Sequence, residues 1–249
     1  MGFFGLFGSK EEREKGTLRK LAKRLTERYG PPENRQKAIA QLGDLGTPEA
    51  LETLCLRFTV RVEPGITDDE EKETTRAILV DAREASIGPI EQFVTREEEG
   101  IAWGLRALAD VAPAAKVREV ALRELARLGR TYTRDPEKKL VLLKWLKEHH
   151  SGTGGAEVEA ALLPLLEDFS DDVRISATRA LAALAPGESA RDGLIQLLLR
   201  DRENARVRGE VLDALAGLGA DVKGYRPSVE ALLVEPFFLD REGRVKKRV

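Results

Sequence analysis

The 249-residue chain has a single cysteine, Cys55, and two histidines, His149 and His150. One thiol forms no disulfide framework within a chain and supplies no cysteine-based metal site. Neighbouring positions on a helix point about 100° apart, so the adjacent histidines do not easily share a metal ion. We therefore predict no metal site. Because Cys55 lies among leucines, we interpret it as a buried structural thiol.

The sequence also has few aromatic residues and no marked excess of acidic or basic residues. Aromatics make up 5% of the residues, so the core must consist mainly of Leu, Ala, Val and Ile, a mixture rich in helix formers. The 41 Lys and Arg residues face 43 Asp and Glu residues, for a formal net charge of −2. Nucleic-acid binders usually carry a basic excess, because phosphate neutralisation supplies much of their affinity. We expect no nucleic-acid partner.

Sequence signals for membrane insertion and for catalysis are missing as well. The sequence has no run of 18 apolar residues and no signal-peptide core, which leads us to expect a cytoplasmic protein. The stretch 152–155, Gly-Thr-Gly-Gly, lacks the preceding strand and the Lys-Ser/Thr of a phosphate-binding loop. Acidic residues cluster at predicted helix starts, where negative charge suits the helix dipole. We expect no catalytic residue and no cofactor.

Internal repetition is the strongest feature that is present. Residues 172–184 match residues 206–218 at an offset of 34 residues, and the frame recurs at 117–129 and more weakly at 35–46. The apolar positions follow steps of three and four, so they form one stripe on a helix. A single helix pair cannot bury such a stripe, which predicts that the copies stack.

The repeated pattern resembles a known family. Val-Arg-x-x-Ala-x-x-Ala-Leu-x-x-Leu, as in 173–184, is similar to the first-helix signature of HEAT repeats, including the short HEAT-like repeats of phycobilin lyases. Residues 58–73 and 132–139 look like those of a group of bacterial HEAT-repeat proteins with no assigned activity. The resemblance covers most of the chain. It implies an all-α fold, an α-solenoid of about six helix pairs behind a leading N-terminal helix.

Proline-containing breaks and the apolar stripes give the predicted organisation. Residues 1–9 form an apolar tip, 10–235 the solenoid and 236–249 a C-terminal tail. Phe58, Val60 and Val62 alternate, which predicts an extended insertion near 58–67. The predicted helices are a leading helix at 10–29 and the pairs 33–46 with 48–58, 68–85 with 87–96, 98–112 with 114–129, 136–150 with 155–169, 172–185 with 189–200, and 204–219 with 226–234.

Arginines recur at one position of the repeat, at Arg35, Arg118, Arg174 and Arg208. Such a ladder could bind an acidic ligand. In HEAT-like repeats this arginine commonly pairs with an acidic residue of a neighbouring repeat, and Asp171, Asp172 and Glu203 are available. We favour the structural interpretation.

The N-terminus offers two interpretations. Residues 1–30 hold eight basic and four acidic side chains, a local charge of about +4, and Phe3, Phe4 and Phe7 precede them. An apolar tip before a basic helix suits a membrane surface or a partner's groove. Alternatively, the phenylalanines fold back and cover the first helix pair.

The functional hypothesis is a non-enzymatic scaffold that binds a protein on the concave face of the solenoid, with the insertion and the two termini adding contacts. The alternatives are a peripheral membrane adaptor that makes a weak membrane-surface contact through its N-terminus, and a HEAT-fold enzyme of the lyase or DNA glycosylase type. The candidate protein-binding residues are Phe3, Phe4, Phe7, Arg61, Glu63, Trp103, Phe237 and Phe238.

Overall fold

The structure is a computed structural model that describes residues 10–150, 154–184 and 187–248. Over these residues it contains thirteen α-helices, two short 3-10 helices and one two-stranded sheet, which confirms the predicted all-α solenoid. The chain divides into two compact units, residues 1–117 and 118–249. The boundary falls inside α7 (Ala114–Leu128).

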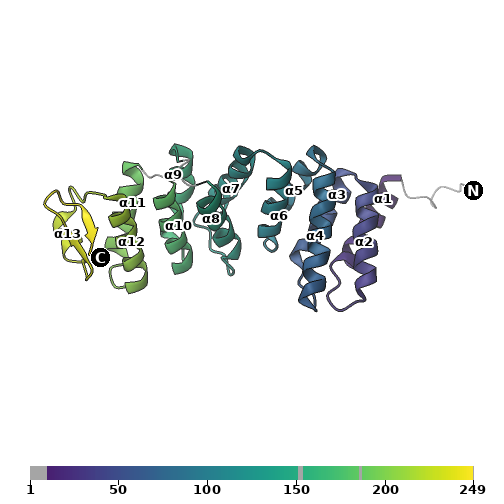
Figure 1. The fold of residues 1–249 in the computed structure, drawn as a ribbon, viewed down its shortest axis with the longest axis horizontal. Coiled ribbons are helices and arrows are strands. Elements are labelled where there is room, and N and C mark those ends of the chain that lie inside the picture. Colours follow the sequence, from purple (N-terminus) through teal and green to yellow (C-terminus); the bar gives the residue numbers. More distant parts are fainter. Residues whose placement is uncertain (1–9, 151–153, 185–186, 249) are drawn as a thin grey trace, which may run out of the picture. The chain divides into compact units, whose positions relative to one another are not determined.

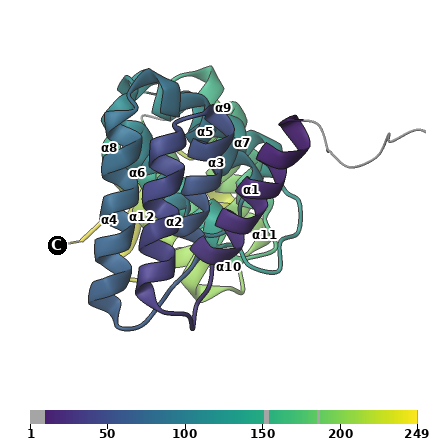
Figure 2. The same ribbon diagram turned by 90° about the vertical axis from the view of Figure 1, so that its right-hand side faces the viewer.

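Unit 1 is a stack of helices in two layers. Odd-numbered helices pack against one another in one layer and even-numbered helices in the other. In Figure 2, α2 and α4 lie on one side and α1 and α3 on the other. The elements of unit 1 before α7 are α1 (Lys10–Leu25), α2 (Pro32–Leu45), α3 (Pro48–Cys55), the 3-10 helix η1 (Leu56–Thr59), α4 (Gly65–Asp81), α5 (Glu84–Arg96) and α6 (Ile101–Val111).

Unit 2 repeats this arrangement. Helices α8, α10 and α12 pack side by side, and η2, α11 and α13 form the other layer (Figure 1). The elements after α7 are α8 (Glu137–His149), α9 (Ala156–Leu162), the 3-10 helix η2 (Leu163–Glu167), α10 (Asp171–Ala183), α11 (Glu188–Arg200), α12 (Ala205–Leu218), α13 (Arg226–Glu230), β1 (Phe237–Leu239) and β2 (Val245–Lys247).

Local sequence explains where several helices begin and end. The side chains of Thr47 and Asn204 accept hydrogen bonds from the first-turn backbone N–H groups of α3 and α12, which satisfies donors that a helix leaves open. Gly46 and Gly219 follow α2 and α12 in the left-handed conformation, where a glycine costs least. Over most of the chain, the observed helix boundaries agree with the predicted ones to within a few residues.

Gly100 occupies a third left-handed position, before α6, with φ of 75°. A Cβ at this residue would lie 2.5 Å from the backbone oxygen of Phe58. Both the conformation and the close approach of the two backbones require glycine here.

The cores contain the residues that the repeat predicts. Val173 and Leu181 of α10 are buried, as are Val207 and Leu215 at the equivalent positions of α12. Cys55 is also fully buried, and the loss of solvation raises the pKa of its thiol far above the ordinary value. The prediction that Cys55 is buried is confirmed.

The insertion near 58–67 is less extended than predicted. Residues 56–59 form η1 and α4 already begins at Gly65, so the irregular extended stretch is 60–64. The alternation itself is real, since Val60 and Val62 are buried while Arg61 and Glu63 are exposed. The segment between η1 and α4 is thus anchored through alternate side chains.

Residues 236–249 include an ordered hairpin. Strands β1 and β2 pair antiparallel, with Phe237 opposite Lys247 and Leu239 opposite Val245. A further bridge joins Asp221 to Arg244, and β2 packs on α12. In Figure 1 the hairpin lies next to α12 and α13. The predicted tip, residues 1–9, lies outside the described residues.

Candidate functional site

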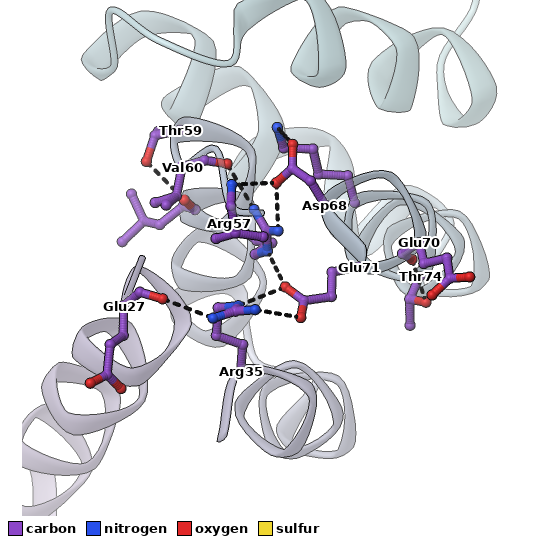
Figure 3. A network of polar contacts seen from close by, with 12 residues as sticks. Glu27, Arg35, Arg57, Thr59, Val60, Asp68, Glu70, Glu71 and Thr74 are labelled. Atoms are coloured by element: carbon purple, nitrogen blue, oxygen red, sulfur yellow. Dashed lines mark hydrogen bonds and ion pairs between the residues drawn. The ribbon is translucent and has the colours of Figure 1, made fainter. Parts of the chain in front are cut away.

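A cluster of buried charges joins three elements of unit 1 (Figure 3). Its centre is Arg57 of η1, which is fully buried. The Nε atom of Arg57 donates to Glu71 Oε2 at 2.8 Å, and Nη2 donates to Asp68 Oδ1 at 2.7 Å. Nη1 donates to the backbone oxygen of Val60 at 2.8 Å. One side chain therefore ties the extended stretch 60–64 to two acidic residues of α4.

Arg35 of α2 shares Glu71 with Arg57. Its Nε and Nη2 atoms donate to the two carboxylate oxygens of Glu71 at 2.9 and 3.1 Å, a two-pronged geometry. Its Nη1 atom donates to the backbone oxygens of Glu27 and Gly30, both at 3.0 Å. Because Arg35 and Glu71 are both buried, this contact fixes the loop between α1 and α2 against α4.

Asp68 and Lys72 complete the cluster. Lys72 Nζ lies 2.7 Å from Asp68 Oδ2, and the backbone N–H of Val62 donates to Asp68 Oδ1. Burial alone would raise the pKa of Asp68, but the hydrogen bonds and positive charges of Lys72 and Arg57 outweigh it and lower that pKa. Asp68 is therefore held ionised by its own neighbours, as befits a structural anchor rather than a general acid.

Unit 2 contains a comparable series of contacts in its even-numbered layer. Lys139, in the first turn of α8, donates to the backbone oxygens of Gly129 and Thr131 and to Asp168 Oδ2. Arg174 of α10 contacts Asp201 with Nε 2.8 Å from Oδ2. In each case a basic side chain of one repeat meets an acidic residue from the loop before the next even-numbered helix.

The recurring arginines are engaged in structural contacts. Arg35 and Arg174 pair with acidic residues of the following repeat, as predicted, and Arg208 donates to a backbone oxygen, that of Arg202. Arg118 of α7 also pairs with an acidic residue of another helix, Glu157 of α9, at 2.7 Å.

The faces of the even-numbered helices are grooved. In unit 2, a groove of about 480 Å³ runs across α10 and α12 and touches α8. It is lined by Lys147, Arg179, Ala182, Ala183, Glu210, Asp213, Ala214, Gly217 and Leu218.

A second groove of about 410 Å³, between α8 and α10, shares Lys147 and Arg179 with the first. The two grooves thus form one continuous surface. We call this combined surface, with the residues that line it, the unit 2 groove.

Small residues form the floor of the unit 2 groove and charges form its edges. Ala182, Ala183, Ala214 and Gly217 leave the space that larger side chains would fill. Arg179 on α10 makes two hydrogen bonds to Glu210 on α12, at 2.8 and 2.6 Å. Ion pairs of this kind hold neighbouring helices in register, and an apolar channel remains open beside them.

Unit 1 has a corresponding groove of about 540 Å³ between α2 and α4. Glu71, buried and bound by Arg35 and Arg57, borders it. The other residues lining it are Gln36, Ile39, Ala40, Glu70, Glu73, Thr74 and Ile78. This groove is more acidic than the unit 2 groove.

Trp103, a predicted binding residue, packs within unit 1. Its ring stacks on Phe58 with the centroids 5.8 Å apart and the planes at 10°. Arg106, on α6 like Trp103, places its guanidinium 4.6 Å from the centroid of the Trp103 ring. The Trp103 side chain is thus half-buried and in contact with its neighbours.

The other predicted binding residues are dispersed. Arg61 and Glu63 are exposed on the stretch 60–64 of unit 1. Phe237 and Phe238 lie on β1 of unit 2, beneath the cationic groups of Lys247 and Arg248 at 5.4 and 5.5 Å. The structure does not bring these residues together within one unit. Phe3, Phe4 and Phe7 lie outside the described residues.

The two histidines have different surroundings. His149 stacks on Trp145 with the ring centroids 3.9 Å apart and is exposed. His150 is buried, and burial together with the charges of Arg118 and His149 lowers its pKa. Among the described residues, no group of three or more His, Cys, Asp or Glu side chains could hold a metal ion. Nor is any described helix long and apolar enough to cross a bilayer.

Sequence reasoning missed the unit 2 groove and the buried cluster. The groove has a sequence signal, since Ala182 and Ala183 align with Ala216 and Gly217 at the repeat offset of 34 residues. Two repeats with small residues at equivalent positions indicate an open helix face. The buried cluster has a partial signal in the repeat arginine Arg35, whereas Arg57 lies outside the repeated pattern.

Comparison with known proteins supports the repeat architecture. Residues 159–236, from within α9 to just before β1, match the family model described as HEAT repeats. This confirms the predicted HEAT repeats over that range, which contains most of the unit 2 groove. Among proteins with curated functions, none matches the sequence.

One solved structure is similar over most of its length. Human deoxyhypusine hydroxylase in complex with glycerol matches 89% of this chain with 90% of its own, at 18% identity and a TM-score of 0.33. At that degree of likeness it carries no argument about activity.

Proposed function

We propose that this protein is a non-enzymatic scaffold that binds a segment of a partner protein in the unit 2 groove. The observation that carries the proposal is the floor of small residues across α10 and α12, where Ala182, Ala183, Ala214 and Gly217 open an apolar channel on a helical repeat face. Stacked helical repeats commonly bind proteins on such surfaces.

The partner segment that fits best is an amphipathic helix. Large apolar side chains at helical spacing would enter the channel, as they do in other helix-in-groove complexes. Lys147 and Arg179 lie at the edges together with Glu210 and Asp213, so partner residues of either sign could find an opposite charge. Such edge charges contribute mainly to orientation and to the association rate.

Two observations favour binding over catalysis. The buried carboxylates of unit 1 are engaged by Arg35, Arg57 and Lys72. At the unit 2 groove, Arg179 pairs with Glu210 and Arg206 with Asp172. In each case the charged groups are bound to one another rather than turned toward a substrate.

Two glycines of α12 provide a matched experiment. Gly217 lines the groove, whereas Gly209 does not, and an added Cβ meets no other atom within 4 Å at either position. Gly217→Leu should therefore fill the channel without disturbing the helix, and Gly209→Leu is the control.

The partner is identified by crosslinking and mass spectrometry with the wild-type protein in a lysate of its source. Its affinity for each purified variant is then measured by calorimetry. Binding should weaken at least tenfold with Gly217→Leu and stay unchanged with Gly209→Leu. Equal affinities for all three proteins would rule out the groove as the binding site.

A further inference from the structure

The second half of α1 carries a group of exposed cations. Within the part of the chain that the structure describes, none of their side chains forms a hydrogen bond or an ion pair, whereas Lys15 is bound to Glu11 at 2.6 Å. The helix dipole favours basic residues in the last turn of α1 but not the two that precede it. We call this group the α1 cationic face, and it consists of Arg19, Lys20, Lys23 and Arg24 of α1 and Arg28 just after it.

The spacing of these cations is unfavourable for α1 alone. Arg19 and Lys23 are four residues apart, as are Lys20 and Arg24, so each pair places two like charges next to each other on the helix. Glu27 does not relieve this repulsion, because its side chain lies against Gly30. An acidic surface placed against these cations would remove the repulsion.

The other side of unit 1 carries exposed carboxylates. Helices α2 and α4 run side by side, since Arg35 binds Glu71 in their first halves and a Cβ on Gly43 would lie 3.0 Å from Ile78 in their second halves. Figure 2 shows α1 on the opposite side of this unit. Four exposed carboxylates of the two helices have no hydrogen-bond or ion-pair partner among the described residues, namely those of Glu33, Asp44, Glu70 and Asp81.

These four carboxylates are regularly spaced around the groove of unit 1. Glu33 and Asp44 are eleven residues apart on α2, and Glu70 and Asp81 are eleven residues apart on α4. Eleven residues are close to three turns, or about 16 Å, so the two carboxylates of each helix lie on the same side of it. We call these four residues and the groove between α2 and α4 the α2–α4 acidic face.

The α2–α4 acidic face has an excess of negative charge. Helices α2 and α4 together hold eight acidic and four basic side chains. Three glutamates and no Lys or Arg line the groove itself. Two of the three, Glu71 and Glu73, are already bound by arginines. Glu70 and the other three exposed carboxylates therefore remain available to a cationic partner.

We propose that two copies of the protein associate, with the α1 cationic face of each copy against the α2–α4 acidic face of the other. Residues 19–24 span about 8 Å along α1, and their long side chains extend toward both ends of the groove. Aliphatic stems of Lys and Arg cover apolar surface while their charged ends stay polar, which suits a groove that contains Ala40 and Ile78. A reciprocal contact of this kind closes after two copies.

A second copy explains more of unit 1 than another polyanion does. A lipid bilayer or a nucleic acid would neutralise the α1 cationic face and leave the α2–α4 acidic face without a partner. Because the two faces lie on opposite sides of the unit, one copy does not pair its own charges. Two copies pair both faces at once. This inference does not depend on the unit 2 groove, which belongs to the other unit.

The test is sedimentation equilibrium of the purified full chain. Exposed ion pairs are individually weak, so we expect a Kd on the order of 10–100 µM at low salt. The protein should be monomeric in about 1 M NaCl, where charges are screened beyond about 3 Å.

Two charge-reversed variants make the test specific. One combines Arg19→Glu, Lys20→Glu and Lys23→Glu, and the other combines Glu33→Lys, Glu70→Lys and Asp81→Lys. Each variant alone should associate at least about tenfold more weakly than wild type, because like charges then face each other. An equimolar mixture of the two should associate again, since each variant presents the charge that the other lacks. Misfolded variants would not recover in this way, and circular dichroism checks that both are folded.

The matched control reverses three exposed cations of unit 2, through Arg134→Glu, Lys223→Glu and Arg241→Glu. It changes the net charge as much as the α1 variant does and should dimerise like wild type. The proposal is overturned if this control loses as much association as the α1 variant, or if the mixture of folded charge-reversed variants stays monomeric. It is also overturned if wild type is monomeric at low salt, including the case in which it binds anionic vesicles or DNA instead.

Discussion

Lys139 and Asp168 form a buried ion pair although 29 residues separate them, with Nζ 2.6 Å from Oδ2 and both side chains at most 5% exposed. Lys139 also holds the loop before α8 through two backbone oxygens. Tyr132 in that loop and Phe169 beside Asp168 meet edge to face, with the ring centroids 5.6 Å apart. One buried contact therefore sets the relative position of two loops and of their exposed rings.

Breaking this pair should destabilise unit 2. Asp168→Asn leaves the Lys139 ammonium buried without its counter-charge, which typically costs about 3–5 kcal/mol. The measurement is urea-induced unfolding followed by circular dichroism. Glu167→Gln is the control, because it removes the neighbouring but exposed pair with Arg130 and should cost less than about 1 kcal/mol. Equal losses for the two variants would contradict the importance assigned to burial.

The buried cluster of unit 1 depends on Glu71 in the same way. Glu71→Gln should cost about 3–5 kcal/mol, because Arg35 and Arg57 both lose their shared carboxylate. Glu70→Gln, at an exposed position one residue earlier, should change the free energy of unfolding by less than about 0.5 kcal/mol. Hydrogen exchange should show faster exchange around residues 60–64 for Glu71→Gln alone. Unchanged exchange there would mean that the cluster does not anchor this stretch.

His150 should make the protein less stable in mild acid. Its pKa is lowered below the ordinary 6.5 in the folded state, so in the unfolded state it takes up a proton first as the pH falls. The unfolded state then binds more protons, and the free energy of unfolding decreases as the pH drops below about 6.5. Urea titrations between pH 7.5 and about pH 5 measure this slope. His150→Gln should flatten it, whereas His149→Gln, which removes only the smallest of the three causes of the shift, should change it much less.

Two glycine substitutions should have opposite effects. Gly217→Ala lies within α12, where an added Cβ meets nothing within 4 Å, and should stabilise the protein by about 0.5–1 kcal/mol through helix propensity. Gly100→Ala places a Cβ 2.5 Å from the oxygen of Phe58 at a positive φ, and should destabilise it by at least about 1 kcal/mol. Melting temperatures of the two variants are compared with wild type. A Gly100→Ala protein with the melting temperature of wild type would show that α6 can move away from η1.

The helical repeat could be predicted from the sequence because its signal is local. Val173 and Val207 begin matching apolar stripes, and those stripes became α10 and α12 with the predicted residues buried. Arg118 carries the same flanking motif as Arg174 and likewise pairs with an acidic residue of another helix, Glu157 of α9.

Beyond the arginine pairs, contacts between repeats could not be predicted. Arg57 meets Glu71 only because the stretch 60–64 turns back onto α4, and no periodic pattern encodes that turn. Strands β1 and β2 are three residues each, too short for an alternating pattern to stand out. The unit 2 groove is a property of three helices together, although its small residues Ala183 and Gly217 are visible in the sequence.

The C-terminal hairpin affects how copies of the protein can associate. Val222 and Val245 are buried where the hairpin covers α12, and Lys247 bonds to Asp213 of that helix at 2.6 Å. A bare last repeat would present an apolar side that fits the side of another copy, which invites head-to-tail fibres. The hairpin covers that side of α12, so these apolar side chains are not available to another copy.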